Sequence, residues 1–203
     1  MNVVALTRDE IVARVRPHEP GRKVRGDHDF NPEIRPRPPL KPAAVLVGLV
    51  DRPDGMTVLL TERTQHLADH AGQISFPGGR IEPQDDGPEA AALRETEEEI
   101  GLPRDRIELI GRLDTYETST GYEVVPVVGL VRPPFVLLPD PHEVADVFEV
   151  PLAFILDPVN HERRSREWQG GTRQFFVLPY QQRYIWGATA GMLVNLAQIL
   201  SGG

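Results

Sequence analysis

The chain has 203 residues, of which 40% are hydrophobic and 26% are charged, and its formal net charge is −8. These values are typical of a single soluble globular domain. The acidic balance argues against a nucleic-acid partner, because such proteins usually carry a basic stripe. No apolar run approaches the ~20 residues that span a bilayer, so we expect no membrane association.

Cysteine is absent from the sequence. Disulfides, thiolate catalysis and iron–sulfur clusters are therefore excluded. The N-terminal stretch contains Asp9 and Glu10 and lacks the apolar block of a signal peptide, so we expect a cytoplasmic protein. Small phosphorylated ligands remain compatible with the negative charge, because a metal ion or a few local arginines can bind them.

The N-terminal region is expected to form a short helix and an irregular arm. Thr7 and Glu10 are spaced as in a capping box, which predicts a helix beginning there. Residues 16–42 are rich in proline and charge, a composition typical of irregular backbone. We therefore predict that residues 1–42 form a helix and arm packed on a domain that occupies residues 43–203.

Apolar and β-branched runs predict the strands of this domain. Residues 43–50 are continuously apolar, as expected for a buried strand, and a turn joins them to residues 56–63 in a hairpin. Gly170 and Gly171 favour the tight turn of a second hairpin. The other predicted strands are 73–77, 106–119 and 122–132, and the second hairpin covers 163–180.

Three segments have helical patterns. Residues 88–102 form the clearest helix, residues 151–157 begin with Pro151 at the first helical position, and residues 186–200 close the chain as an amphipathic helix. Strands thus flank two long helices around one mixed sheet. This order predicts the α/β class and an α/β/α sandwich.

The helix at 88–102 carries four glutamates between positions 95 and 99. At about 100° per residue, Glu95, Glu98 and Glu99 fall together on the side opposite the core. Glu97 borders the packed side, where we expect it to face solvent or form a salt bridge. The residues expected on the buried side are Ala90, Leu93, Thr96 and Ile100.

A solvated face is the ordinary explanation for a glutamate-rich helix. Two features oppose it here: the helix dipole disfavours negative charge at the C-terminal end, and Arg94 is the only cation in the segment. Carboxylates at i, i+3 and i+4 can instead share Mg²⁺ or Mn²⁺. Gly78 and Gly79, upstream, let the backbone approach a ligand closely. Together these features indicate metal-dependent chemistry on a phosphate ester or anhydride.

Residues 79–102 resemble the signature of the Nudix hydrolases, in which a glycine and a spaced acidic residue precede Arg-Glu-aliphatic-X-Glu-Glu-X-Gly-aliphatic. The chain has Gly79 and Asp85 at the first two positions, and residues 94–102 supply the rest. Asp85 replaces the usual glutamate and stands one residue farther from the arginine, which leaves its role open. Thr96 replaces a larger aliphatic residue.

The resemblance implies a Nudix-type α/β/α sandwich and a role for each matching residue. It implies that Glu95, Glu98 and Glu99 bind the divalent metals, Mg²⁺ or Mn²⁺, and that Arg94 orients a glutamate through a salt bridge. Nudix enzymes often bring a further acid from a loop, and Glu143 is the candidate for that acid. The expected catalytic residues are Arg94, Glu95, Glu98 and Glu143.

A second stretch, residues 59–79, is similar to the extra motif of the coenzyme A pyrophosphatase branch of this family. Its residues match that motif at the expected spacings, and the mismatch is Thr64 in place of serine. The shifted Asp85 and Thr96 are also usual in this branch. The implied reaction is hydrolysis of coenzyme A to adenosine 3′,5′-bisphosphate and 4′-phosphopantetheine.

Several residues near these motifs are candidates for contacts with this nucleotide substrate. Arg63 and Arg80 are phosphate candidates, although Arg63 can equally pair with a carboxylate at its strand end. His70, in a loop, is a candidate ligand contact or a structural residue. The backbone at Gly78 and Gly79 completes the predicted substrate-binding set. The aromatic residues Phe175, Phe176 and Trp186 are expected in the core, with adenine stacking as the alternative.

Two other functions compete with this hypothesis. The chain could be a Nudix enzyme acting on ADP-ribose, NADH or dinucleoside polyphosphates, which the match over residues 59–77 opposes. It could also be a catalytically inactive nucleotide-binding module, which the intact glutamate set opposes. The sequence leaves open the preference among free, oxidised and acylated coenzyme A, the phosphorus attacked, the general base and whether a homodimer forms.

Overall fold

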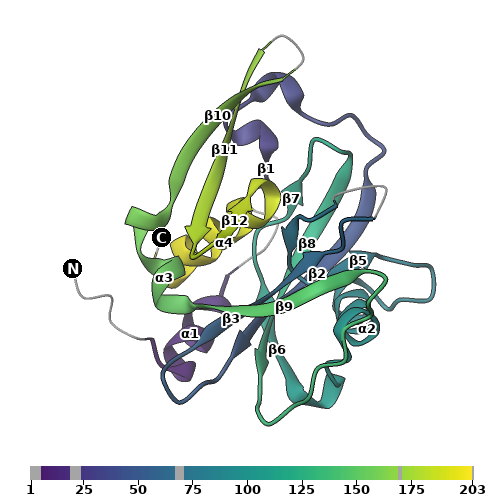
Figure 1. The fold of residues 1–203 in the computed structure, drawn as a ribbon, viewed down its shortest axis with the longest axis vertical. Coiled ribbons are helices and arrows are strands. Elements are labelled where there is room, and N and C mark those ends of the chain that lie inside the picture. Colours follow the sequence, from purple (N-terminus) through teal and green to yellow (C-terminus); the bar gives the residue numbers. More distant parts are fainter. Residues whose placement is uncertain (1–5, 19–23, 67–70, 169–170, 203) are drawn as a thin grey trace.

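The structure is a computed structural model that describes residues 6–18, 24–66, 71–168 and 171–202. Its main element is a mixed sheet of nine strands, and a smaller antiparallel sheet of three strands lies beside it (Figure 1). Helices cover both faces of the main sheet, so the predicted α/β/α sandwich with a mixed sheet is confirmed. None of the helices in the described residues is both long and apolar enough to cross a membrane.

The centre of the main sheet is a parallel pair of long strands. β2 (Lys41–Val50) pairs with β8 (Tyr122–Val131) over its whole length. β6 (Ile107–Arg112) runs antiparallel to β8 on one side. On the other side, β3 (Thr57–Arg63) pairs with β2 over a short stretch and with β9 (Val144–Pro151) over seven residue pairs. The remaining strands of this sheet are β1 (Arg25–Gly26), β4 (Ile74–Ser75), β5 (Gly78–Arg80) and β7 (Tyr116–Glu117).

Alternate residues of β2 enter two separate cores, as the pleat of a strand requires. Val47 and Leu49 pack with α1 (Arg8–Val15), α3 (Leu152–Leu156) and α4 (Gly187–Leu200) on one face. Ala44 and Leu46 pack with α2 (Pro88–Ile100) on the other face. Because both faces of β2 are buried, its sequence is continuously apolar, as a central parallel strand should be.

The smaller sheet contains β10 (Glu162–Trp168), β11 (Gly171–Tyr180) and β12 (Arg183–Trp186). The predicted hairpin is confirmed, but Gly171 lies in β11 opposite Trp168 instead of in the turn. α4 packs against this sheet and contributes to the first core, and residues 192–197 are all buried. The prediction of an amphipathic helix is therefore wrong, because α4 has neighbours on every side along this stretch.

The single strand predicted at 106–119 is also wrong. Pairing shifts between Leu109 and Gly111, and the strand ends at Arg112. Asp114 follows, buried, with its backbone N–H donating to Asn195 Oδ1 at 3.1 Å and its carboxylate accepting from Asn195 Nδ2 at 3.0 Å. At this position the backbone N–H and the buried carboxylate of Asp114 are hydrogen-bonded to Asn195 of α4, and not to a neighbouring strand. β9 was not expected from the sequence.

The N-terminal helix has the predicted capping box. Thr7 N donates to Glu10 Oε2 at 2.8 Å, and Glu10 N donates to Thr7 Oγ1 at 3.3 Å. Ile11 and Val15 are fully buried in the first core, so this segment is packed on the domain. The boundary at residue 42 stays a prediction.

Candidate active site

The candidate site forms where α2 lies against β5. Pro88 begins the helix, and Gly101 ends it in the left-handed conformation with φ of 67°. β5 runs antiparallel to the start of β2, so that Gly79 lies opposite Ala44. A Cβ on Gly79 would lie 2.4 Å from the carboxyl carbon of Glu95. The glycine is therefore required for the helix carboxylate to lie directly on the strand backbone.

The buried face of α2 differs from the predicted one. Glu99 is only 6% exposed, whereas Leu93 is only partly buried. The prediction that Glu95, Glu98 and Glu99 share a solvent-facing side is thus wrong for Glu99. The physical reason is that Glu99 has polar partners outside the helix, since the Gly78 N–H donates to its Oε2 and Arg63 lies near its Oε1. The buried residues of the helix are Ala91, Ala92, Thr96, Glu99 and Ile100.

Glu99 is held in an unusual electrostatic environment. The pKa of its carboxyl is raised to about 7, mainly by burial and in smaller part by the nearby charges of Glu143 and Glu95. The Gly78 N–H, which donates to Glu99 Oε2 at 3.0 Å, and Arg63 partly offset that rise in pKa. Burial likewise raises the pKa of Glu95, with Glu98 and Glu143 as additional causes. Several carboxylates therefore share a region with too few cations.

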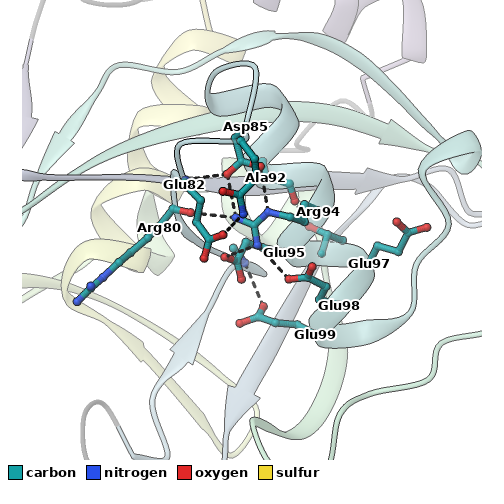
Figure 2. A network of polar contacts seen from close by, with 12 residues as sticks. Arg80, Glu82, Asp85, Ala92, Arg94, Glu95, Glu97, Glu98 and Glu99 are labelled. Carbon is teal, nitrogen blue, oxygen red and sulfur yellow. Dashed lines mark hydrogen bonds and ion pairs between the residues drawn. The ribbon is translucent and has the colours of Figure 1, made fainter.

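Arg94 connects the carboxylates of this region through hydrogen bonds (Figure 2). It donates to Asp85 through Nε at 3.0 Å and through Nη2 at 2.9 Å, a two-bond geometry typical of strong arginine–carboxylate pairs. Its Nη1 donates to Glu95 Oε1 at 2.9 Å and to Glu98 Oε2 at 3.0 Å. The predicted arginine–glutamate salt bridge is therefore present, and it involves both glutamates.

Asp85, whose role the sequence left open, is the structural partner of Arg94. Its side chain is only 4% exposed. The hydrogen bonds from Arg94 and from the Glu82 backbone N–H hold the pKa of Asp85 down at about 2. Asp85 is therefore charged at neutral pH and fixes the guanidinium from the side opposite the glutamates.

Arg63, Glu143 and His70 are also predicted from the sequence to belong to the site with the glutamates. Arg63 Nη1 is 3.8 Å from Glu99 Oε1, and Arg63 Nε is buried without a hydrogen-bond partner in the described structure. Glu143 lies in the turn just before β9, as predicted, and its backbone carbonyl accepts from Thr64 N at 3.0 Å. Its carboxylate is close enough to raise the pKa of Glu95 and Glu99. His70 lies outside the described residues.

Two charged residues, Arg80 and Glu97, point away from the cluster formed by Glu95, Glu98 and Glu99. Arg80 extends away from the glutamates in Figure 2 and donates to the Tyr122 hydroxyl at 3.2 Å. The structure therefore does not bring Arg80 together with the predicted carboxylates. Glu97 accepts from Arg104 Nε at 2.7 Å, which confirms the expected salt bridge.

The glutamates suit a hard divalent cation by chemistry, because carboxylate oxygens are the ligands that Mg²⁺ and Mn²⁺ prefer. Their mutual effect on pKa also favours a positive charge at this place. No group of three or more acidic or histidine residues in the described parts of the chain is already arranged around one point. Arg94 occupies oxygens of Glu95 and Glu98, and Gly78 occupies one of Glu99. Metal binding therefore requires these carboxylates to turn.

A cavity of about 440 Å³ lies next to Glu99, although none of the glutamates lines it. Arg63 and Gly78 line it near Glu99, and Trp186 lines it toward α4. Trp186 is thus partly exposed to the cavity, whereas Phe175 is buried, with the two rings edge to face at a centroid distance of 5.6 Å. Segments distant in the sequence complete the cavity wall, namely Asp27, residues 118–120, Arg166 and Arg173.

A glycine strand, an arginine-organised set of glutamates and an adjoining cavity on an α/β/α sandwich define the class of the Nudix hydrolases. The family model of the NUDIX domain matches residues 39–169. The chain therefore belongs to the Nudix hydrolase family. Enzymes of this family act on nucleoside diphosphate derivatives and generally use divalent metal ions.

Two relatives of this chain with 41% identity are described as Nudix hydrolases. NudL of Shigella flexneri, described as an uncharacterized Nudix hydrolase, is 41% identical over 170 residues, which cover 83% of this chain and 88% of NudL. NudL of Escherichia coli K12 is also 41% identical, over 155 residues, 76% of this chain and 80% of that protein.

Solved structures of Nudix proteins align with part of this chain at lower identity. An Ap4A hydrolase of C. elegans in a binary complex is 22% identical, with a TM-score of 0.48 over 54% of this chain and 80% of that chain. The Nudix hydrolase RenU of M. smegmatis is 24% identical, with a TM-score of 0.48 over 55% of this chain and 71% of that chain.

Proposed function

We propose that this protein is a divalent-metal-dependent pyrophosphohydrolase that cleaves coenzyme A, or its derivatives, to adenosine 3′,5′-bisphosphate and 4′-phosphopantetheine, or the acylated form of the latter. One observation carries the choice of substrate. The segment that resembles the coenzyme A motif, residues 59–79, supplies one wall of the cavity next to Glu99, through Arg63, residues 73–76 and Gly78. The residues that suggest coenzyme A therefore lie where a substrate of this site would bind.

The same segment also fixes the loop that carries Glu143. Thr64 N donates to the Glu143 carbonyl at 3.0 Å, and Thr64 Oγ1 donates to the His142 carbonyl at 3.0 Å. Threonine at position 64 keeps the hydroxyl that this second bond needs. The motif thus supports both the cavity wall and the position of the additional acid.

In the proposal, Glu95, Glu98 and Glu99 hold the metal ions, Mg²⁺ or Mn²⁺. Arg94 sets the positions of Glu95 and Glu98, and Asp85 fixes Arg94. Bound divalent ions neutralise charge on the anhydride and lower the pKa of a water molecule. Glu143 is the candidate acceptor of the proton from the attacking water, because its carboxylate lies close to those of Glu95 and Glu99.

The substrate side of the site is formed by cations and backbone. Arg63 combines a buried, unpaired Nε with a position on the cavity wall, which favours a contact with substrate phosphate. The backbone at Gly78 and Gly79 has no side chains that would block its approach to the substrate. Water attacks one phosphorus, the bridging P–O bond breaks, and the other phosphate leaves with the bridging oxygen.

Incubation of the purified protein with coenzyme A and Mg²⁺ or Mn²⁺, with separation of the products by chromatography, tests the proposal. We expect adenosine 3′,5′-bisphosphate and 4′-phosphopantetheine in equal amounts. If coenzyme A stays intact while another nucleoside diphosphate derivative is cleaved, the chosen substrate is wrong. If no such compound is cleaved, the alternative of a catalytically inactive nucleotide-binding module is favoured.

A further inference from the structure

We propose that the cavity has a second anion site, at Arg166, which binds a phosphomonoester of the substrate that is separate from the anhydride. In coenzyme A this group is the 3′-phosphate of the adenosine half. The inference rests on the proposed function, because it assigns part of that substrate to part of the same cavity. Arg166, Arg173 and Trp186 are called the arginine end below, and Glu95, Glu98 and Glu99 with Arg94 are called the carboxylate end.

The charges that line the cavity do not cancel. Three arginines line it, Arg63, Arg166 and Arg173, against one carboxylate, that of Asp27. Asp27 Oδ2 accepts from Arg173 Nη2 at 2.7 Å, and this pair neutralises Arg173. Arg63 lies near Glu99, at 3.8 Å, so Arg166 remains as the arginine of the cavity wall that no carboxylate of the described residues compensates, in a chain whose net charge is −8. A positively charged cavity in a protein of negative net charge favours an anionic ligand.

Arg166 is the least compensated of these residues. Its guanidinium lies 4.9 Å from the Trp186 ring centroid and 5.9 Å from that of Phe175. Within the described residues it has these aromatic contacts and no bound carboxylate. A guanidinium stacked on a ring keeps its N–H groups free at the edge, where they can bind phosphate through two hydrogen bonds.

The strand register places a second arginine next to it. In the antiparallel pair of β10 and β11, Arg166 lies directly opposite Arg173. Like charges at directly opposite positions destabilise a sheet. Asp27 compensates one member of the pair, and a bound anion would compensate the other. The arrangement is therefore unfavourable without a ligand and favourable with one.

Asp27 also organises the wall opposite these strands. Its Oδ1 accepts from the Tyr116 hydroxyl at 3.0 Å, and its Oδ2 accepts from Ser119 N at 2.8 Å as well as from Arg173. One buried carboxylate from the N-terminal arm thus fixes both Arg173 and the segment 118–120, which line the cavity. Arg173, the neighbour of Arg166, is consequently held in place before any ligand binds.

The cavity lies next to the carboxylate end, because Arg63 and Gly78 line it and both contact Glu99, although none of the residues of that end lines it. Arg166 and Trp186 line it elsewhere. A substrate with its anhydride at the carboxylate end therefore extends other groups toward the arginine end. In coenzyme A, the 3′-phosphate is an anion outside the anhydride, and it is the group whose charge the unpaired arginine matches.

The test compares coenzyme A with 3′-dephosphocoenzyme A, which has the same anhydride and lacks the 3′-phosphate. We expect Arg166→Gln to lower the ratio of kcat/KM for coenzyme A to kcat/KM for the dephospho compound by about tenfold or more, mainly through KM. The ratio is insensitive to a partly unfolded sample, because unfolded protein lowers both rates equally. An unchanged ratio would overturn the proposal.

Arg164→Gln is the matched control. Arg164 is exposed on the same strand and lies over the Tyr184 ring at 5.4 Å. It differs in being bound to Glu162, at 2.8 and 2.6 Å, and in not lining the cavity. We expect the ratio in this variant to equal that of the wild type. An equal fall in both variants would mean that general surface charge, and not the Arg166 site, selects the phosphate.

A binding experiment separates this inference from the proposed function. Calorimetry with adenosine 3′,5′-bisphosphate and with adenosine 5′-monophosphate measures the preference for a second phosphate without any turnover. We expect the wild type to bind the bisphosphate about tenfold more tightly and Arg166→Gln to lose that preference. If coenzyme A is not hydrolysed but this preference is found, the proposed function fails and the anion site stands. If both compounds bind equally well, the anion site fails.

Discussion

At the carboxylate end, Arg94 is bound to three carboxylates at 2.9 to 3.0 Å, whereas Arg166 at the arginine end lies on aromatic rings. The first end has an excess of negative charge around Arg94, with Arg63 as a second cation near Glu99. The second has an excess of positive charge. The negative charge of the first end suits metal ions, and the positive charge of the second suits a phosphate. This distribution of charge is expected of a site that binds a metal-bound anhydride carrying an additional phosphate group. The predictions below test whether the two ends act as differently as their charges suggest.

The largest effect is expected at the carboxylate end from Glu98→Gln. This change removes one charged metal ligand and leaves the shape of the side chain almost intact, so kcat should fall by about 10³-fold for every substrate. Steady-state kinetics in Mg²⁺ and a thermal melt measure activity and folding together. Glu97→Gln is the control, because Glu97 lies next to it, is exposed and is bound to Arg104. A Glu98→Gln enzyme that keeps its activity would remove Glu98 from the metal site.

A second change, Gly79→Ala, displaces a carboxylate instead of removing it. The new Cβ would lie 2.4 Å from the carboxyl carbon of Glu95, so that side chain must move. We expect kcat to fall by about 10²-fold, since small displacements of reacting groups cost this much. Gly48→Ala, in strand β2, is the steric control, because its nearest new contact is 3.4 Å. Equal kinetics in the two variants would show that the position of Glu95 is unimportant.

Asp85→Asn tests the support of Arg94. The variant keeps the size of the side chain but loses the charge that holds the guanidinium in place. We expect kcat to fall by about tenfold while KM changes little, because the metal ligands remain and only their orientation loosens. A rise in KM with constant kcat would instead assign Asp85 to substrate binding.

The smallest effect is expected on the free energy of unfolding of the metal-free protein. Burial raises the pKa of Glu99 to about 7, above its ordinary value of 4.5. The folded state therefore binds a proton more readily than the unfolded state, and stability falls as pH rises between these two values. Glu99→Gln should remove this penalty, which is on the order of 3 kcal/mol above pH 7.

Thermal melts of metal-free wild type and Glu99→Gln measure this difference. We expect the variant to gain more stability relative to the wild type at pH 8 than at pH 4, where Glu99 is protonated in the folded state. The same difference at both pH values would contradict the raised pKa of the buried Glu99.

The two ends also differ in how far the sequence predicts them. The carboxylate end lies within residues 78–101, so a helical period, a glycine pair and a family signature could locate it. Burial of Glu99 was missed, because the helical wheel ranks residues by hydrophobicity and takes no account of polar partners outside the helix, here the Gly78 N–H and Arg63. The role of Asp85 needed the geometry of its pair with Arg94.

The arginine end could not be predicted in the same way. Asp27, Ser119, Arg166 and Trp186 come from four separate segments, and no local pattern links them. The one available signal was the hairpin. A turn at Gly170-Gly171 would place Arg166 opposite Phe175, whereas the observed register places it opposite Arg173. A shift of one residue in the turn therefore hid the pair of like charges.

The central claim is that coenzyme A is the substrate of this two-ended site. A competition experiment tests it most directly: coenzyme A, ADP-ribose and NADH at equal concentration in one reaction with Mg²⁺, with each compound followed over time by chromatography. Relative rates of loss give the ratios of kcat/KM without separate measurements. We expect coenzyme A to disappear first, by a wide margin. Faster loss of ADP-ribose or NADH would contradict it.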